Sequence, residues 1–124
     1  MAKRSGRLLV NRQGDVGVVV IQEKQFLKDD VITEVGDELV GLVDQGYNKM
    51  VIDFQNVQYL SSKMLGKLMA LYKRIEAEGG GLALCSVKKE LREVFEVTQL
   101  DKVLNLQADQ ARAVESLKKK KGWI

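Results

Sequence analysis

The chain has 124 residues, which is enough for one domain, because single domains mostly hold about 100–150 residues. It contains 20 Lys and Arg against 17 Asp and Glu, for a formal charge of +3, and no His. The absence of His excludes Ser-His-Asp and Cys-His catalysis and His-ligated metal sites, and the single Cys85 excludes an internal disulfide. We therefore expect neither an enzyme nor a protein that holds a metal ion or another cofactor.

The N-terminal part of the sequence predicts a β-hairpin. Two runs rich in β-branched and apolar residues, Arg7 to Val10 and Val16 to Ile21, are separated by a short polar stretch. Gly14 in that stretch is the expected residue of positive φ, the conformation that tight hairpin turns require.

A helix and a strand are predicted next. From Val31 to Val43 apolar residues recur at three- and four-residue steps, which is typical of an amphipathic helix. Asp29 or Asp30 is the expected N-cap, and Gly46 is expected to end the helix. The continuous apolar run Met50-Val51-Ile52 then predicts a strand buried on both faces.

The clearest amphipathic pattern of the chain runs from Met64 to Ile75, within a helix expected over Ser61–Glu78. Gly79-Gly80-Gly81 follows this helix and leads into a strand, so it predicts a C-cap and turn; a phosphate-binding loop would have to precede a helix. Gly81 to Cys85 is the expected strand, and Cys85 within it is expected to be a small buried apolar residue.

The remaining elements complete an alternation of strands and helices. Ser86 is the expected N-cap of a helix whose apolar positions are Leu91, Val94 and Phe95, Val103 to Leu106 is a last short strand, and a helix follows from about Ala108 to Leu117. Strands that alternate with helices imply right-handed crossovers. We predict an α/β fold with a mixed, mostly parallel sheet of about five strands, an antiparallel N-terminal hairpin and helices packed on the sheet.

The positive charge lies at the two ends of the chain. Residues 1–12 carry four basic and no acidic residues, Lys118–Lys121 add four, and residues 13–117 hold 12 basic and 17 acidic residues. A nucleic-acid-binding domain is more often basic on its folded face, so no nucleic-acid partner is expected. No apolar run approaches the roughly 18 residues of a membrane span, and no signal-peptide pattern is present, so we expect a cytoplasmic protein without stable membrane insertion.

The stretch from Val51 to Leu71 is the candidate functional region. A buried strand ends at Asp53, and after a loop two serines, Ser61 and Ser62, begin the amphipathic helix. Either hydroxyl can accept a hydrogen bond from the first helical turn, which is a purely structural role. Lys63, Lys67 and Arg74 follow helical spacing with the small residues Gly66 and Ala70 among them, a pattern that fits either a docking face or an ordinary solvated face.

These residues resemble the STAS domains of bacterial anti-sigma factor antagonists. The family pattern is a buried strand ending near an Asp, an aromatic-aliphatic pair, and then Asp-Ser-Ser-Gly-Leu-Gly at the start of a helix. Here Val51-Ile52-Asp53 is followed by Tyr59-Leu60 and by Ser61-Ser62-Lys63-Met64-Leu65-Gly66. The likeness covers residues 7–117, with a tail on each side (1–6 and 118–124), and its element order is the one predicted above.

The resemblance implies a non-catalytic regulator whose partner is an anti-sigma factor or a related serine kinase. The contact is expected at Ser61, Ser62, Lys63, Gly66 and Lys67, with Asp53 and its loop alongside. In the family the second serine of the motif is phosphorylated, and this abolishes partner binding; that position is Lys63 here. A lysine side chain cannot carry the stable phosphate ester that serine forms, so the usual phosphorylation switch is not expected.

Two alternatives remain open at this point. The chain could be a constitutive scaffold or transport-complex subunit, as other STAS proteins are. Phosphorylation could also fall on Ser62 or Ser61, where a phosphate would gain from the helix N-terminus and from Lys63.

Overall fold

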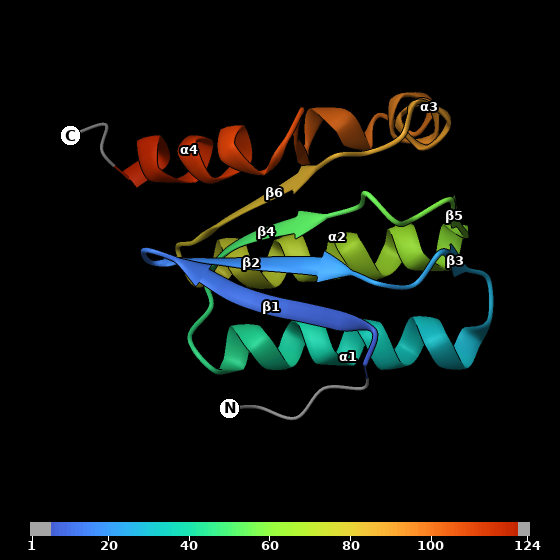
Figure 1. Cartoon of the computed structure of the whole chain (residues 1–124), viewed down its shortest axis with the longest axis horizontal. Coiled ribbons are helices and arrows are strands. Elements are labelled where there is room, and N and C mark those ends of the chain that lie inside the picture. Colours follow the sequence, from blue (N-terminus) through green and yellow to red (C-terminus); the bar gives the residue numbers. More distant parts are fainter. Residues whose placement is uncertain (1–5, 122–124) are drawn as a thin grey trace.

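A mixed five-stranded sheet with the order β1-β2-β4-β6-β7 organises the fold. The first two strands pair antiparallel and all other neighbours pair parallel, which confirms the predicted topology (Figure 1). The structure is a computed structural model that describes residues 6–121, with side chains described over residues 6–118. Its strands are β1 (Leu8–Gln13), β2 (Val16–Ile21), β3 (Gln25–Phe26), β4 (Lys49–Asp53), β5 (Tyr59–Leu60), β6 (Gly81–Cys85) and β7 (Asn105–Gln107). The helices are α1 (Asp29–Asp44), α2 (Ser62–Ala77), α3 (Lys89–Val97) and α4 (Gln110–Lys121), with a 3-10 turn at Leu100–Lys102.

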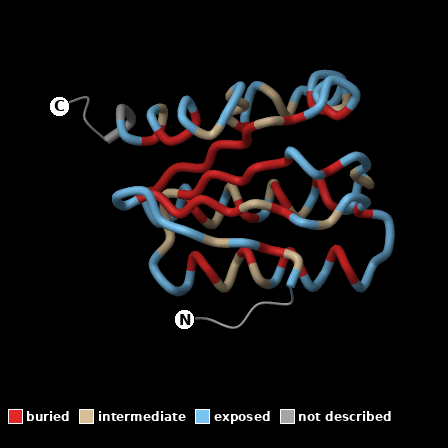
Figure 2. The backbone as a smooth tube through the Cα atoms, in the orientation of Figure 1, coloured by how far each residue is buried: buried red, intermediate tan, exposed pale blue. Residues whose placement is uncertain are grey.

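The central strands are buried on both faces because helices cover both sides of the sheet (Figures 1 and 2). On β4, Met50 and Ile52 belong to the core shared with α1 and α2, whereas Val51 belongs to a second cluster with Ala113, Val114 and Leu117 of α4. Successive strand side chains alternate between faces, so a continuous apolar run such as Met50-Val51-Ile52 supplies both cores.

Three of the predicted turn glycines adopt positive φ. Gly14 lies in the hairpin with φ 67°, Gly46 follows α1 with φ 104°, and Gly79 follows α2 with φ 74°. These values lie in the left-handed region that side chains with a Cβ rarely adopt, so glycine ends each element there at little cost.

Two of the predicted helix caps are wrong. The N-cap of α1 is Lys28, and Asp29 and Asp30 lie in the first turn, where carboxylates interact favourably with the helix dipole. The N-cap of α3 is Lys88, not Ser86, which instead adopts φ 58° directly after β6. The sheet needs this sharp turn before α3 can begin.

The C-terminal third also differs in its boundaries. The last strand begins at Asn105, two residues later than expected, because the 3-10 turn at Leu100–Lys102 occupies the connection from α3. Helix α4 continues through Lys121, so the expected C-terminal tail at 118–124 begins inside a helix; residues 1–5 and 122–124 lie outside the described residues. Over residues 6–121, none of the helices has the length and apolar character that a membrane span requires.

A two-stranded parallel ribbon, β3 with β5, was not predicted. Gln25 pairs with Tyr59, and Phe26 pairs with Leu60. The ribbon lies at the end of the molecule where α1, α2 and α3 begin (Figure 1). Two residues per strand are too few to produce a period in the sequence, so no alternation could indicate this pair.

Candidate docking site

The start of α2 is fixed by hydrogen bonds on both sides of Ser61. Its side-chain oxygen accepts a hydrogen bond from the Met64 backbone N–H at 3.4 Å, so it is the N-cap of α2. Its own backbone N–H donates to the Phe26 carbonyl at 3.0 Å, which ties the helix start to the ribbon. Ser62 is exposed beside it. The structure therefore gives Ser61 the capping role and leaves the Ser62 hydroxyl at the surface.

Lys63 is half-exposed and forms an ion pair with α1. Its Nζ lies 3.5 Å from Oδ2 of Asp29, and its side chain retains 46% exposure. The first turn of α2 contains no acidic residue, so Lys63 places a cation where the helix dipole is already positive. Asp29 offsets part of that unfavourable interaction, and it does so from the surface, where salt screens the pair.

The other two basic residues of the predicted stripe also face α1. The methylene stem of Lys67 lies across Gly36, where an added Cβ would come within 3.1 Å of its Cδ. Arg74 makes an ion pair with Asp44 at the other end of α1. These side chains therefore line the junction between the two helices, and Lys63 and Lys67 reach the solvent only at its edge.

A stripe of small residues occupies the outer face of α2. Ser62, Gly66 and Ala70 are all exposed and lie four residues apart, hence on one side of the helix. A Cβ built on Gly66 meets no atom within 4 Å. No contact within the fold requires glycine at this position, so its small size leaves the helix surface open to a close neighbour.

Asp53 lies beneath the loop that precedes α2 and is not part of the surface. The residue is 2% exposed. Its Oδ1 accepts the Gln55 backbone N–H at 2.8 Å, and its Oδ2 accepts the side-chain amide of Gln110 in α4 at 2.6 Å. Lys88 adds a hydrogen bond from its Nζ to the Gln55 carbonyl. Asp53 therefore holds the loop in place and ties it to α4.

Cys85 is fully buried and is paired in register with Asp53 on the neighbouring strand. Burial, together with the smaller contributions of the Asp53 and Asp109 charges, raises the pKa of its thiol to about 11, while a hydrogen bond with Ser86 acts in the opposite direction. A thiol with this pKa is protonated at neutral pH, so it has little nucleophilic character.

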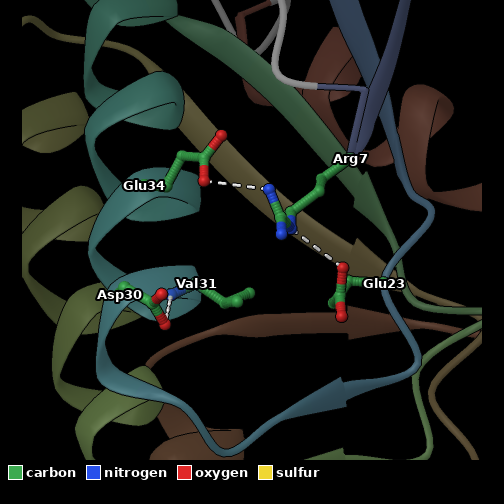
Figure 3. Close-up of polar contacts among 5 residues, drawn as sticks. All are labelled: Arg7, Glu23, Asp30, Val31 and Glu34. Atoms are coloured by element: carbon green, nitrogen blue, oxygen red, sulfur yellow. Dashed lines mark hydrogen bonds and ion pairs between the residues drawn. The ribbon is translucent and has the colours of Figure 1, made fainter.

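Ion pairs fix the loop after β2 against α1 (Figure 3). The Arg7 guanidinium donates to Glu23 at 3.0 Å and to Glu34 of α1 at 2.9 Å, as Figure 3 shows. In the same view the Oδ1 of Asp30 accepts the backbone N–H of Val31 at 2.8 Å. Arg7 thereby bridges the loop that precedes β3 to α1.

Two exposed apolar residues, Tyr59 in β5 and Leu27 directly after β3, were missed by sequence reasoning. Tyr59 is 57% exposed and Leu27 is 56% exposed. Tyr59 was recognised only as part of a family motif, and Leu27 had no signal, because its exposure depends on the short ribbon that turns Phe26 inward. Within the described residues no three His, Cys, Asp or Glu side chains form a group that could hold a metal ion.

The geometry defines an α/β domain in which the capped helix α2 exposes the small residues Ser62, Gly66 and Ala70. A STAS domain family model matches residues 9–113. The chain therefore belongs to the STAS domain family.

Relatives of known class support the same grouping. The chain is 26% identical over 103 residues to the anti-sigma-B factor antagonist of Bacillus subtilis, which covers 83% of this chain and 91% of the relative. It is 36% identical over 61 residues to BtrV of Bordetella bronchiseptica, classed with the anti-sigma factor antagonists, and this stretch spans 49% of the chain and about half (53%) of that relative.

A solved structure supports the fold. A Thermotoga maritima protein of the same class superposes with a TM-score of 0.80 at 22% identity, covering 91% of this chain and 96% of that one. At this identity the similarity establishes the fold alone.

Proposed function

We propose that this chain is a non-catalytic regulator of the anti-sigma factor antagonist type, which acts by docking on an anti-sigma factor or a related serine-kinase regulator. Its relatives in Bacillus subtilis and Bordetella bronchiseptica support this class of partner. The observation that carries the proposal is the exposed small-residue face at the start of α2, where a Cβ added to Gly66 would meet no other part of the fold within 4 Å.

In this proposal Ser62, Lys63 and Gly66 make the central contact, and Ser61 and Lys67 border it. Ser62 and Gly66 lie four residues apart on the outer face, and Lys63 projects between that face and α1. Asp53 contributes by positioning: its two carboxylate oxygens keep the preceding loop beside the helix start. Small side chains such as these lose little conformational entropy when a partner covers them.

We further propose that docking is not governed by phosphorylation at position 63. Lysine stands at the position of the family phosphoacceptor, and it carries the charge opposite to that of phosphoserine. If modification occurs nearby, the accessible acceptor is Ser62, because the Ser61 hydroxyl caps the helix. Intact mass measured after incubation with cell extract and ATP tests this: a species heavier by about 80 Da that maps to Ser62 and no longer binds the partner would contradict an unswitched mode of action.

A constitutive scaffold or transport-complex subunit is the second candidate, and the missing phosphoacceptor is the observation that favours it. The neighbouring genes distinguish the two. Sigma and anti-sigma genes support the first proposal, whereas genes for transporter subunits support the second.

Co-purification from the native host tests the docking surface. Tagged wild-type chain is expected to recover a kinase-like or sigma-regulatory partner, and Lys63→Glu and Gly66→Arg are expected to lose it. Gly41→Arg is the matched control, because a Cβ added to this helical glycine also meets no other part of the fold within 4 Å, but Gly41 lies near the C-terminal end of α1. If both α2 variants retain every recovered partner, the docking surface lies elsewhere.

A further inference from the structure

The ribbon β3–β5 presents an apolar surface that the fold leaves uncovered. Phe26 is fully buried and Leu60 packs against the core, so the alternation of side chains directs their neighbours Gln25, Leu27 and Tyr59 outward. Leu27 and Tyr59 are each more than half exposed. Large apolar side chains at the surface are ordinary when single, but here two lie close in the chain to one small ribbon: Tyr59 in β5, and Leu27 directly after β3; we refer to them as the apolar patch.

Four lysines border this patch. The Lys24 carbonyl accepts the backbone N–H groups of Gln58 and Tyr59 at 2.7 and 3.2 Å, which places this residue against the ribbon. Lys28 follows Leu27 in the sequence. Lys63 lies two residues after Ser61, whose backbone N–H donates to the Phe26 carbonyl. Lys88 and Tyr59 line the same hollow of about 340 Å³, together with Gln58 and Glu90.

Three acidic residues at this end of the molecule offset part of the charge of the four lysines. Asp29 is paired with Lys63, the Oδ1 of Asp30 accepts the backbone N–H of Val31, and Glu90 lines the hollow together with Lys88. Lys24 and Lys28 are both exposed, and so is Lys88, whose Nζ also donates to the Gln55 carbonyl. Four lysines against three carboxylates leave the surface around Leu27 and Tyr59 with a small net positive charge, although the body of the chain is acidic.

We propose that this lysine-bordered ribbon face (Leu27 and Tyr59 with Lys24, Lys28, Lys63 and Lys88) binds a partner segment that carries an apolar side chain flanked by carboxylates. The apolar side chain enters the hollow beside Tyr59, and the carboxylates meet Lys24 and Lys88. The inference rests on the proposed function, since it assigns the chemistry of the partner at the same end of the molecule. The lysines attract the carboxylates of such a segment and repel a basic segment.

A random dodecapeptide phage library, selected on the full-length chain, tests the inference without the natural partner. Enriched peptides are expected to contain an aromatic or aliphatic residue next to Asp or Glu. Synthetic copies are expected to perturb the amide NMR signals of Leu27 and Tyr59 and to bind more weakly as salt is raised. The double variant K24E/K88E is expected to lose about ten-fold or more in peptide affinity.

The charge-matched control is K73E/K102E, whose lysines are exposed but lie outside the ribbon face. It is expected to bind as the wild type does, and thermal melts establish that both double variants are folded. Three results would overturn the inference. The selection could enrich neutral or basic peptides, it could enrich no peptide on the wild type relative to K24E/K88E, or K24E/K88E could bind the selected peptides as tightly as the wild type. None of these results depends on Gly66, so the proposed function and this inference fail separately.

Discussion

Gly80→Ala is expected to destabilise the fold strongly, whereas Gly66→Ala is not. A Cβ at Gly80 would lie 1.7 Å from the Asn48 carbonyl oxygen and 2.7 Å from its carbon. That oxygen also accepts the backbone N–H of Gly81 at 2.9 Å, at the start of the β4–β6 pairing. The added methyl must therefore break this hydrogen bond or displace a strand end, and neither atom belongs to a flexible side chain.

The magnitude follows from these two contributions. A lost buried backbone hydrogen bond costs about 1–3 kcal/mol, and a methyl forced into packed structure costs a further 1–3 kcal/mol or so. We therefore expect the free energy of unfolding to fall by at least about 1–3 kcal/mol, and by about 2–6 kcal/mol if both contributions apply. Gly66→Ala meets no atom within 4 Å and raises helix propensity, so we expect a gain of about 0.5–1 kcal/mol.

Urea unfolding followed by far-UV circular dichroism measures both values. The midpoint is expected to move in opposite directions for the two variants, with the slope unchanged. A Gly80→Ala chain as stable as the wild type would refute the close approach of Gly80 to Asn48, and a strongly destabilised Gly66→Ala would refute the open outer face of α2.

Three further predictions concern other parts of the molecule. Ser61→Ala is expected to lower the unfolding free energy by about 1 kcal/mol through loss of the cap, and Ser62→Ala to change it by less than about 0.5 kcal/mol; equal losses in urea titrations would contradict the capping assignment. Gly17→Ala is expected to displace the Tyr47 ring, because the added Cβ would lie 2.4 Å from it, while Arg12 lies over the ring at 4.6 Å from its centroid. We expect the free energy of unfolding to fall by about 1–3 kcal/mol, and an unshifted Tyr47 NMR signal would argue against this packing. Because the folded-state pKa of Cys85 is raised to about 11, the unfolded chain loses its thiol proton first, so stability falls as pH rises from about 9 to 11, by about 2–3 kcal/mol in all. Cys85→Ala removes this part of the pH slope, and parallel profiles for the two proteins between pH 9 and 11 would contradict it.

The sheet and helices could be predicted because each carries a long pattern. The run Met50-Val51-Ile52 has no polar alternation, and the structure buries it between two layers of helices. Gly14, Gly46 and Gly79 were predicted as turn residues because few other residues tolerate their backbone conformation.

The features that could not be predicted depend on contacts between residues that are distant in the sequence. Serine is a preferred N-cap residue, but Ser86 adopts a left-handed conformation in the turn after β6, and α3 begins later. Lys63 and Arg74 have the spacing of a free basic stripe, but α1 lies alongside and supplies Asp29 and Asp44 as partners. The packing of α1 on α2 cannot be predicted from a local sequence pattern.

The sequence grouped the candidate residues but could not assign their structural roles. The strand that ends at Asp53 and the serine pair that begins α2 are where the pattern predicts them, and whether this is the docking surface stays a prediction. The sequence could not assign Asp53 to the interior, since its partner Gln110 lies 57 residues away. It also could not reveal Leu27, whose exposure follows from a ribbon of two residues per strand.

The affinity of the co-purified partner for Gly66→Arg, measured by isothermal titration calorimetry beside the wild type and Gly41→Arg, tests docking through α2 most directly. Arginine is a better helix former than glycine, and an added Cβ meets no other part of the fold within 4 Å at either position, so both variants are expected to fold. The account predicts that Gly66→Arg weakens binding by about ten-fold or more, while Gly41→Arg leaves it unchanged. Equal affinity of all three proteins for the partner would contradict it.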